Sequence, residues 1–250
     1  MYSLFFGLYD SCVKTIKNKI NDYFISKPET GLVENNLFLL LEHTSFLVLG
    51  LALFWNESWL FDITQIWESN IDYKVIIYYY FYTTRYIVQT KMLSRKDKGF
   101  ITYFIHHITT ILLLIFSFQK FNRIGIIIGI NHDVADIPLL TAKILHKTYE
   151  SRDIEIYNYL SKLCFILFIP VFFITRIYLN SDIIYYLTYS KHRVLSKGFY
   201  DFYICYNLLY LNLILQIFWQ IVIVKFAYNM FFGLDAIDEK DGSYMMSKKK

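Results

Sequence analysis

Long apolar segments dominate this sequence and restrict the folds that are open to it. A helix needs about 20 mostly apolar residues to cross the hydrocarbon core of a bilayer. Only helices and closed barrels satisfy all their backbone hydrogen bonds in that core. The segments that meet this length run approximately over residues 37–55, 71–92, 100–118, 122–146, 160–180 and 200–232. We therefore predict an all-α polytopic membrane protein with about six transmembrane helices.

The composition supports a membrane protein and argues against several other classes. Of the 250 residues, 56% are hydrophobic and only 18% are charged, whereas soluble domains carry about 25% charged residues. The net charge of +4 is modest, and the basic residues form short clusters between the apolar segments. This distribution indicates membrane topology, so we expect no nucleic-acid partner. Cys12, Cys164 and Cys205 form neither a disulfide framework nor a CxxC motif.

The chain is predicted to hold one transmembrane domain over residues 37–232. Residues 1–36 form a cytosolic N-terminal segment, in which lysines alternate with apolar residues over 13–19. That stretch predicts either an amphipathic helix on the membrane surface or a solvated lead-in. Residues 233–250 are polar and are expected to form a cytosolic tail.

The basic clusters predict how the chain is oriented in the membrane, because Lys and Arg are enriched in cytosolic connections. The clusters that fall on one side of a six-helix arrangement lie in residues 14–27, 91–98, 147–162 and 240–250. Residues 56–70 hold no Lys or Arg, while residues 181–199 are an exception with three. On balance we predict that both termini are cytosolic. Asn56 would then begin a lumenal Asn-Glu-Ser glycosylation sequon.

Two polar strings interrupt the third and fourth apolar segments. Ionisable residues inside a membrane helix are costly, at roughly 2.5–3.5 kcal/mol for a charged one near the helix centre, and by default they indicate a functional site. His107 lies thirteen residues before Lys120 and Asp133 lies thirteen after it. A hairpin turn near Lys120 would therefore bring both to a similar depth. The five ionisable residues of the two strings are His106, His107, His132, Asp133 and Asp136.

Helical phase predicts that most of these residues lie on facing stripes. At 3.6 residues per turn, His106 and Ser117 share a stripe about 60° wide. His132, Asp136 and Lys143 share one of about 40° on the next segment. Other segments are expected to contribute Tyr78, Tyr82, Arg85, Gln89 and Arg176 to the same polar cavity.

Several kinds of chemistry suit such a cluster. A histidine oriented by a carboxylate can serve as a general base or as a nucleophile, as a proton relay, or as a metal ligand. Adjacent histidines on a helix point about 100° apart, so His106 and His107 would not chelate one metal. The i,i+4 spacing of helical metal ligands is also absent. The remaining alternative is that the polar groups only hydrogen-bond the helices to one another, and for five such groups at one depth we favour a functional site without a metal.

The pattern around these strings matches a known family. The matching residues are His106, His107, Ser117, Asn122, Arg123, Gly125, His132, Asp133, Asp136, Ala142, Lys143 and Tyr149. Further matches lie in residues 57–67, 78–89, 95–100, 175–176 and 215–219. Together they resemble ceramide synthases, the acyltransferase branch of the TLC-domain membrane proteins, over roughly residues 37–232. The sequence departs from that pattern at Leu140, where an acidic residue is common, and at Gln216, where a histidine is common.

The resemblance implies a fold, a reaction and a location. The fold would be a TLC-type helical bundle around a central cavity in the endoplasmic reticulum membrane. The reaction would be N-acylation of a long-chain base, such as sphinganine, by a fatty acyl-CoA to give a (dihydro)ceramide. No cofactor is expected, because the acyl-CoA is a co-substrate. Membrane lipids are further partners, and a homodimer stays open.

The resemblance also ranks the residues. His106 would be the reactive imidazole, oriented by Asp136, and would carry the acyl group covalently; the alternative is a general base for direct attack by the amine. His107, His132 and Asp133 would support this pair. The residues expected to contact the substrates are Tyr82, Arg85, Ser117, Arg123, Lys143 and Arg176.

Two other functions were weighed against acyl transfer. One is a non-enzymatic TLC-domain protein that acts in lipid sensing or trafficking from the endoplasmic reticulum. The other is a proton- or metal-coupled transporter, which predicts inverted repeats or broken helices near the midplane. The sequence shows neither feature of a transporter.

Overall fold

A computed structural model describes Thr15 and residues 30–93, 95, 99–190 and 199–232. Regular structure within these residues is entirely helical. Apart from Thr15, the N-terminal segment predicted as amphipathic lies outside the described residues, as do the basic residues of 191–198 and the tail from residue 233.

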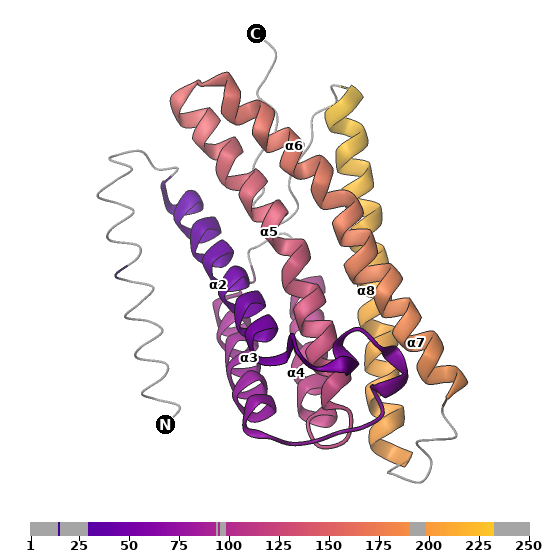
Figure 1. Cartoon of the computed structure of the whole chain (residues 1–250). Coiled ribbons are helices and arrows are strands. Elements are labelled where there is room, and N and C mark those ends of the chain that lie inside the picture. The colour runs from indigo at the N-terminus through magenta and orange to yellow at the C-terminus, as the bar shows by residue number, and fades with distance from the viewer. Residues whose placement is uncertain (1–14, 16–29, 94, 96–98, 191–198, 233–250) are drawn as a thin grey trace. The chain divides into compact units, whose positions relative to one another are not determined.

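Long helices follow one another along the chain (Figure 1). They are α2 (Thr30–Phe54), α3 (Tyr73–Met92), α4 (Phe100–Ser117), α5 (Asn122–Arg152), α6 (Glu155–Phe172), α7 (Leu179–Tyr189) and α8 (Phe199–Phe232). A π-helical turn, η3 (Phe173–Tyr178), joins α6 to α7 without a break, so the described residues contain six continuous helical stretches, as predicted. The predicted segments were shorter than the helices at several ends, because α2 begins at Thr30, α5 continues to Arg152, and the fifth stretch runs from Glu155 to Tyr189.

Length and composition qualify most of these stretches as membrane spans. Among the described residues the five candidates are Val33–Phe54, Phe100–Ser117, Asn122–Arg152, Glu155–Tyr189 and Tyr200–Met230. The helix α3 has a comparable length, but its tyrosines, threonines, Lys74 and Arg85 lower its hydropathy. The all-α polytopic membrane fold is therefore confirmed, and a sixth span at α3 stays a prediction.

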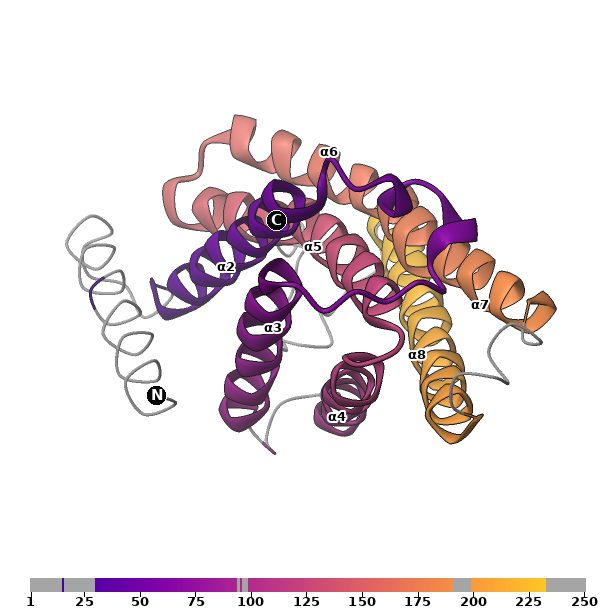
Figure 2. The ribbon, with the colours of Figure 1, turned by 60° about the horizontal axis from the view of Figure 1, so that its bottom comes forward.

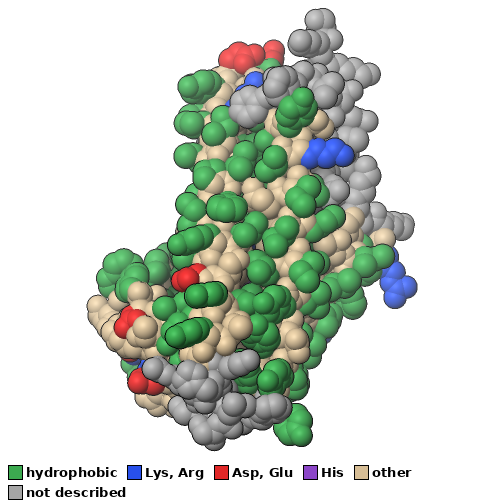
Figure 3. All heavy atoms as spheres, turned by 90° about the vertical axis from the view of Figure 1, so that its right-hand side faces the viewer, with side chains coloured by type: hydrophobic (Ala, Val, Ile, Leu, Met, Phe, Trp, Pro, Cys, Tyr) green, Lys and Arg blue, Asp and Glu red, His purple; other side chains and the backbone are tan. Residues whose placement is uncertain are grey.

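The outer surface of the helices is strongly apolar. Hydrophobic side chains cover most of the face shown in Figure 3, with few charged groups among them. On α8, Ile214, Ile221 and Tyr228 are each more than half exposed. A soluble monomer rarely presents apolar surface on this scale, whereas lipid tails solvate it without cost. The exposed apolar side chains are thus the expected lipid-facing surface of a multi-pass membrane protein.

The chain divides into two compact units. The first holds Met1–Ser45 and Asp136–Phe168, and the second holds Phe46–Ala135 and Ile169–Lys250. Within the first unit, α5 and α6 are joined by a short turn, and the Ser161 hydroxyl on α6 donates to the Ala142 carbonyl on α5 at 2.9 Å. Such a bond satisfies a polar side chain in an apolar helix and fixes the register of the pair.

Within the second unit, α4 packs against both α3 and α8 (Figure 2). The start of α5 approaches α3 closely through two glycines spaced four residues apart. A Cβ at Gly129 would lie 2.6 Å from the Tyr78 hydroxyl, and one at Gly125 would clash with the Tyr79 hydroxyl. Small residues at this spacing let helix backbones approach in membranes. The sequence of α5 is thus adapted to a partner helix rich in tyrosine.

The connection between α2 and α3 contains two short 3₁₀ turns, η1 (Ser58–Leu60) and η2 (Ile63–Gln65). The Asp62 carboxylate caps η2. It accepts hydrogen bonds from the Thr64 hydroxyl at 2.7 Å, the Thr64 backbone amide at 3.0 Å and the Gln65 side-chain amide at 2.8 Å. These bonds, and the one from the Thr64 hydroxyl most of all, lower the pKa of Asp62. Arg123 at the start of α5 donates to the Gln65 carbonyl at 2.6 Å and so ties this connection to the helix.

Candidate functional site

Two histidine rings from α4 and α5 stack in the interior of the second unit. The helices form the predicted hairpin, because α4 ends at Ser117 and α5 begins at Asn122. The His106 and His132 ring centroids are 5.9 Å apart, with an interplanar angle of 14°. Both side chains are buried, at 6% and 3% exposure. The turn arithmetic and the helical phase correctly placed these two residues together.

Aromatic rings enclose His106 on its other sides. The Trp219 ring of α8 meets it edge to face, with centroids 5.1 Å apart at 84°. The Tyr86 ring of α3 lies 6.2 Å from His106 and 5.4 Å from His107. The His107 Nδ1 atom is 3.1 Å from the Thr90 hydroxyl. These rings and the low exposure of its side chain place His106 in a buried, largely aromatic environment.

The hydrogen bonds of His132 define its tautomer. Its Nδ1 lies 2.7 Å from the Ile128 carbonyl, which can only accept. Its Nε2 lies 3.2 Å from the Gln216 amide nitrogen, which can only donate. We therefore assign a neutral imidazole with the proton on Nδ1. The Gln216 amide also donates to Asn212 Oδ1 at 3.0 Å, so a short polar network on α8 holds the ring.

Asp133 is neutralised inside the same unit. The Arg85 Nη1 atom lies 2.7 Å from Asp133 Oδ1, and both side chains are almost fully buried. The Tyr82 hydroxyl lies 3.2 Å from the other carboxylate oxygen. The Arg85 guanidinium lies 4.7 Å from the centroid of the Phe46 ring. A buried charge is tolerated only when it is paired and hydrogen-bonded in this way, so these contacts give Arg85 and Tyr82 a structural task.

Arg176 reaches the site from the π-helical turn η3. Its Nη2 donates to the His132 carbonyl at 2.7 Å, and the side chain is 5% exposed. π-Helical turns are rare and are frequent at functional sites. The turn follows Pro170, which has no amide hydrogen to continue a regular helix.

Two predicted residues, Asp136 and Lys143, belong to the other compact unit. Asp136 Oδ2 lies 3.4 Å from Nδ1 of His43 on α2, and Lys143 is buried. The orientation of His106 by Asp136 is therefore a prediction that rests on the sequence alone. The pairing with His43 was missed, although Glu42 and His43 interrupt an apolar segment in the way that drew attention to the other histidines.

The remaining predicted substrate contacts lie towards the α4–α5 turn. The Ser117 hydroxyl is 2.9 Å from the Tyr79 hydroxyl. Arg123 Nη1 lies 3.2 Å from Glu68 in the α2–α3 connection, and its guanidinium carbon lies 5.5 Å from the centroid of the Trp59 ring. These contacts give both residues a place in the packing, and substrate contact by either of them stays a prediction.

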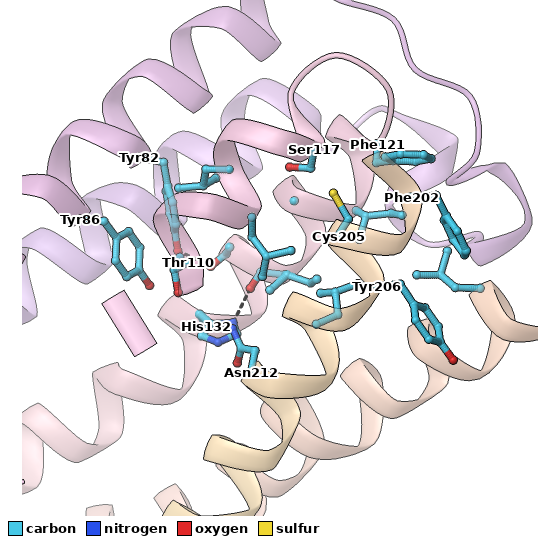
Figure 4. A pocket seen from close by; sticks show the side chains of 18 residues that line it. Tyr82, Tyr86, Thr110, Ser117, Phe121, His132, Phe202, Cys205, Tyr206 and Asn212 are labelled. Carbon is cyan, nitrogen blue, oxygen red and sulfur yellow. Dashed lines mark hydrogen bonds between the residues drawn. The ribbon is translucent and has the colours of Figure 1, made fainter. Parts of the chain in front are cut away.

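An apolar cavity extends from His132 into the bundle (Figure 4). Together with the open space at its mouth, it comprises about 570 Å³ free of protein atoms. His132 and Asn212 stand at one end, together with Thr110, which lies one helical turn after His106. Phe121 and Phe202 stand at the other end. The arrangement places an imidazole beside a space that suits a hydrocarbon chain.

Two polar residues of the site, Gln216 and Asn212, are not predicted as site residues by the sequence pattern, in which Gln216 is only a departure from the ceramide synthase signature. Both are polar residues in an apolar segment, four positions apart, so they share one helix face. Among the described residues, no group of three or more His, Cys, Asp and Glu side chains is arranged to hold a metal ion.

Known proteins are similar to this chain over most of its length. Residues 33–225 match the family model of the TLC domain. Human ceramide synthase 4 is 29% identical over 196 residues, which cover 75% of this chain and 48% of the human protein. The Caenorhabditis elegans ceramide synthase hyl-1 is 28% identical over 222 residues, covering 80% of this chain and 58% of the worm protein. The chain thus spans about half the length of these curated relatives, and it belongs to the TLC-domain family of membrane proteins.

Proposed function

We propose that this protein is a ceramide synthase, which transfers a fatty acyl group from acyl-CoA to the amine of a long-chain base such as sphinganine. The observation that carries the proposal is the His132 ring, which lines one end of an apolar cavity inside the bundle and stacks on the His106 ring. The relatives named ceramide synthase support the same reaction. We further propose residence in the endoplasmic reticulum membrane, with both termini in the cytosol.

The site supplies the parts that acyl transfer needs. The reaction joins a hydrophobic chain to a hydrophobic amine, and both substrates partition into the bilayer. An imidazole that attacks a thioester must be neutral, and the rings of Tyr86 and Trp219 hold the His106 ring in the interior of the unit. The fixed tautomer of His132 presents a stable neighbour to the reacting ring. The apolar cavity would hold the acyl chain while its carbonyl stays near the histidines.

The proposed mechanism has two steps with His106 as the nucleophile. A nitrogen of the imidazole bonds to the thioester carbonyl carbon, the carbon–sulfur bond breaks, and CoA leaves as a thiolate that takes up a proton. The amine of the long-chain base then bonds to the same carbon, the carbon–nitrogen bond to the imidazole breaks, and the amine loses a proton. Asp136 would orient the imidazole during both steps. In the alternative mechanism, His106 takes the proton from the amine as it attacks the thioester directly.

The proposal predicts that His106→Ala abolishes ceramide formation while the protein still inserts into the membrane. The assay would measure (dihydro)ceramide made from acyl-CoA and sphinganine in membranes of cells that lack their own ceramide synthases. His146→Ala is the matched control, because His146 is equally buried but lies on the other unit, beside Glu150. Asp136→Ala is expected to behave like His106→Ala. Full activity of His106→Ala would remove the assignment.

A separate measurement distinguishes the two mechanisms. Purified protein would be exposed briefly to acyl-CoA without an amine acceptor and its intact mass recorded. The covalent route predicts a mass increase of one acyl group that disappears when sphinganine is added and is absent in His106→Ala. An unmodified mass in an active preparation would favour direct attack. Ceramide formation by neither route would favour a non-enzymatic TLC-domain protein.

A further inference from the structure

The cavity beside His132 is lined mainly by α4, α5 and α8, with further residues from α3 and α7. On α5 the lining side begins at His132 and continues through Ile128 and Ile124 to Phe121, which precedes the helix. Eleven residues of helix correspond to about 16 Å. On α8 the lining runs over the ten residues from Asn212 to Phe202, which correspond to about 15 Å. Two helices therefore give the same length for the cavity.

Aromatic side chains close the end of the cavity that is far from His132. The Phe121 and Phe202 rings have centroids 6.2 Å apart. The Trp67 ring lies behind them, 6.3 Å from Phe121 and 5.9 Å from Phe202. All three side chains are buried, at 2%, 5% and 7% exposure. The cavity thus ends on a triangle of packed rings.

Trp67 is itself held in place. It lies in the connection between α2 and α3, close after the capped turn η2. Its indole Nε1 donates to the Ser190 hydroxyl at the end of α7 at 2.9 Å, and this bond is buried. The rings that face the cavity are therefore supported by a fixed residue, so they cannot yield without breaking a buried hydrogen bond.

We propose that Phe121 and Phe202, backed by Trp67, set the longest acyl chain that the protein accepts. This inference rests on the proposed function. The hydrocarbon core of a bilayer is about 30 Å thick, so the chains of one leaflet span about 15 Å. A cavity of about the same length admits no more hydrocarbon than one leaflet's depth and so excludes very-long-chain acyl groups. Each methylene that finds no room forfeits about a fourfold gain in affinity.

The test removes one ring at a time and measures chain-length preference. Phe121→Ala and Phe202→Ala would each be assayed with a series of saturated acyl-CoA substrates of increasing length and with sphinganine. Each variant should shift the optimum to longer chains by two or more methylenes and raise kcat/KM for the first chain that the wild type rejects about tenfold. Phe54→Ala is the matched control, since Phe54 is an equally buried phenylalanine of the same unit that does not line the cavity. An unchanged length profile in active Phe121→Ala and Phe202→Ala proteins would overturn the proposal, as would an equal shift in Phe54→Ala.

A substitution that places a larger side chain in the cavity should have the opposite effect on the preferred chain length. It does not require the protein to fold without one of its buried rings. Cys205 lines the cavity on α8, one turn after Phe202 and two turns before Asn212. Cys205→Phe should shorten the preferred chain by several methylenes, and retention of the wild-type profile would count against the proposal.

Binding separates a failure of this inference from a failure of the proposed function. Native mass spectrometry would compare the lengths of fatty acids retained by the wild-type and variant proteins, independently of turnover. A shifted length profile without any acyl transfer would sustain the chain-length stop and remove the ceramide synthase assignment. Acyl transfer with the same lengths of bound fatty acid in all variants would support the ceramide synthase assignment and overturn the chain-length stop.

Discussion

At the scale of single residues, the site depends on buried polar groups that serve as hydrogen-bond or ion-pair partners for one another. Arg85 satisfies Asp133, and Gln216 satisfies the ring nitrogen of His132. In an apolar bundle, a polar atom that loses its partner has no water to replace it, so removing one member of a pair costs more than the pair contributes. Substitutions at these residues therefore report on partners as much as on the residue that is changed.

Gln216 is predicted to act on catalysis through His132. Gln216→Leu removes the donor to Nε2 and leaves the ring free to rotate or change tautomer. A lost bond to a buried group costs about 1–3 kcal/mol, so kcat should fall about 10-fold to 100-fold with KM nearly unchanged. Gln220→Leu, the same change one turn later on α8, should leave kcat within about twofold of the wild type. Gln216→His restores a ring donor and should recover activity, and equal losses from Gln216→Leu and Gln220→Leu would show that only packing is affected.

The Asp133–Arg85 pair is predicted to contribute to stability more than to binding. Asp133→Leu leaves a buried guanidinium without its counter-ion, which typically costs about 3–5 kcal/mol. The double variant Asp133→Leu/Arg85→Met removes both charges and should regain most of that loss. Thermal unfolding in detergent, followed by loss of helical circular dichroism, measures both. If the double variant were as unstable as Asp133→Leu, the loss of stability would not come from an unpaired Arg85 guanidinium.

At the scale of elements, the contact between α3 and α5 depends on side-chain size at two positions. Gly125 and Gly129 provide the space that the Tyr79 and Tyr78 rings occupy. The Tyr79 hydroxyl uses that space to donate to the Asn122 carbonyl at 3.0 Å. The same tyrosine-rich face of α3 carries Tyr82 and Arg85, so the glycines also position the network around Asp133.

Gly125→Ala is predicted to destabilise the protein because the new methyl group would overlap the Tyr79 hydroxyl. Overpacking of this kind costs about 1–3 kcal/mol. Tyr79→Phe removes the overlapping oxygen, so the double variant Gly125→Ala/Tyr79→Phe should be more stable than Gly125→Ala alone. Tyr79→Phe by itself is the control for the lost hydrogen bond. Unfolding midpoints that simply add would show that the two residues do not share this contact.

The elements show which inferences the sequence allowed. The α4–α5 hairpin was predictable, because apolar length fixed the two helices and the short polar gap fixed the turn. The end of α5 was not, because residues 147–152 are polar and helical hydrogen bonding continued beyond the apolar segment. The π-helical turn that delivers Arg176 leaves no periodic signal, so only the residue and not its backbone was predicted. The helical phase placed Asp136 on the same stripe as His132 and Asp133 to the side of that stripe. In the structure, however, Asp133 is the carboxylate that forms an ion pair with Arg85.

At the scale of the whole molecule, contacts between connections bear on how many times the chain crosses the membrane. The Ser69 hydroxyl in the α2–α3 connection donates to the Gln119 carbonyl in the α4–α5 turn at 3.1 Å. The Asn122 side chain donates to the Asn70 carbonyl at 3.3 Å. The two connections therefore lie on the same side of the bilayer. If α4 crosses the bilayer and ends on the side where α3 begins, α3 is expected to make the opposite crossing despite its lower hydropathy.

The α3 helix can cross because its polar groups are satisfied inside the protein. Tyr79 and Tyr82 bond to α5, and Arg85 is paired with Asp133. A hydropathy average counts these side chains as if they faced lipid and so underestimates the helix. The length of residues 71–92 predicts a membrane span. The hydrogen bonds and the ion pair inside the protein explain how a helix with these polar side chains could cross the bilayer.

Glycosylation mapping tests this sixth crossing. An Asn-Gly-Thr acceptor on a flexible Gly/Ser linker would be inserted after Glu68, or after Arg95 in the α3–α4 connection, with Asn56→Gln removing the native sequon. If α3 crosses, the acceptor after Glu68 is glycosylated and the acceptor after Arg95 is not, because the two connections face opposite compartments. With both termini in the cytosol, as proposed, α5 would carry the chain away from the lumenal side, so an acceptor after Asp153, between α5 and α6, should also stay unmodified. Glycosylation after both Glu68 and Arg95 would mean that α3 does not span. The hydrogen bonds of Ser69 and Asn122 keep the α2–α3 connection and the α4–α5 turn together, so α4 would then not cross the membrane either. The apolar sequence of α4 argues against that outcome.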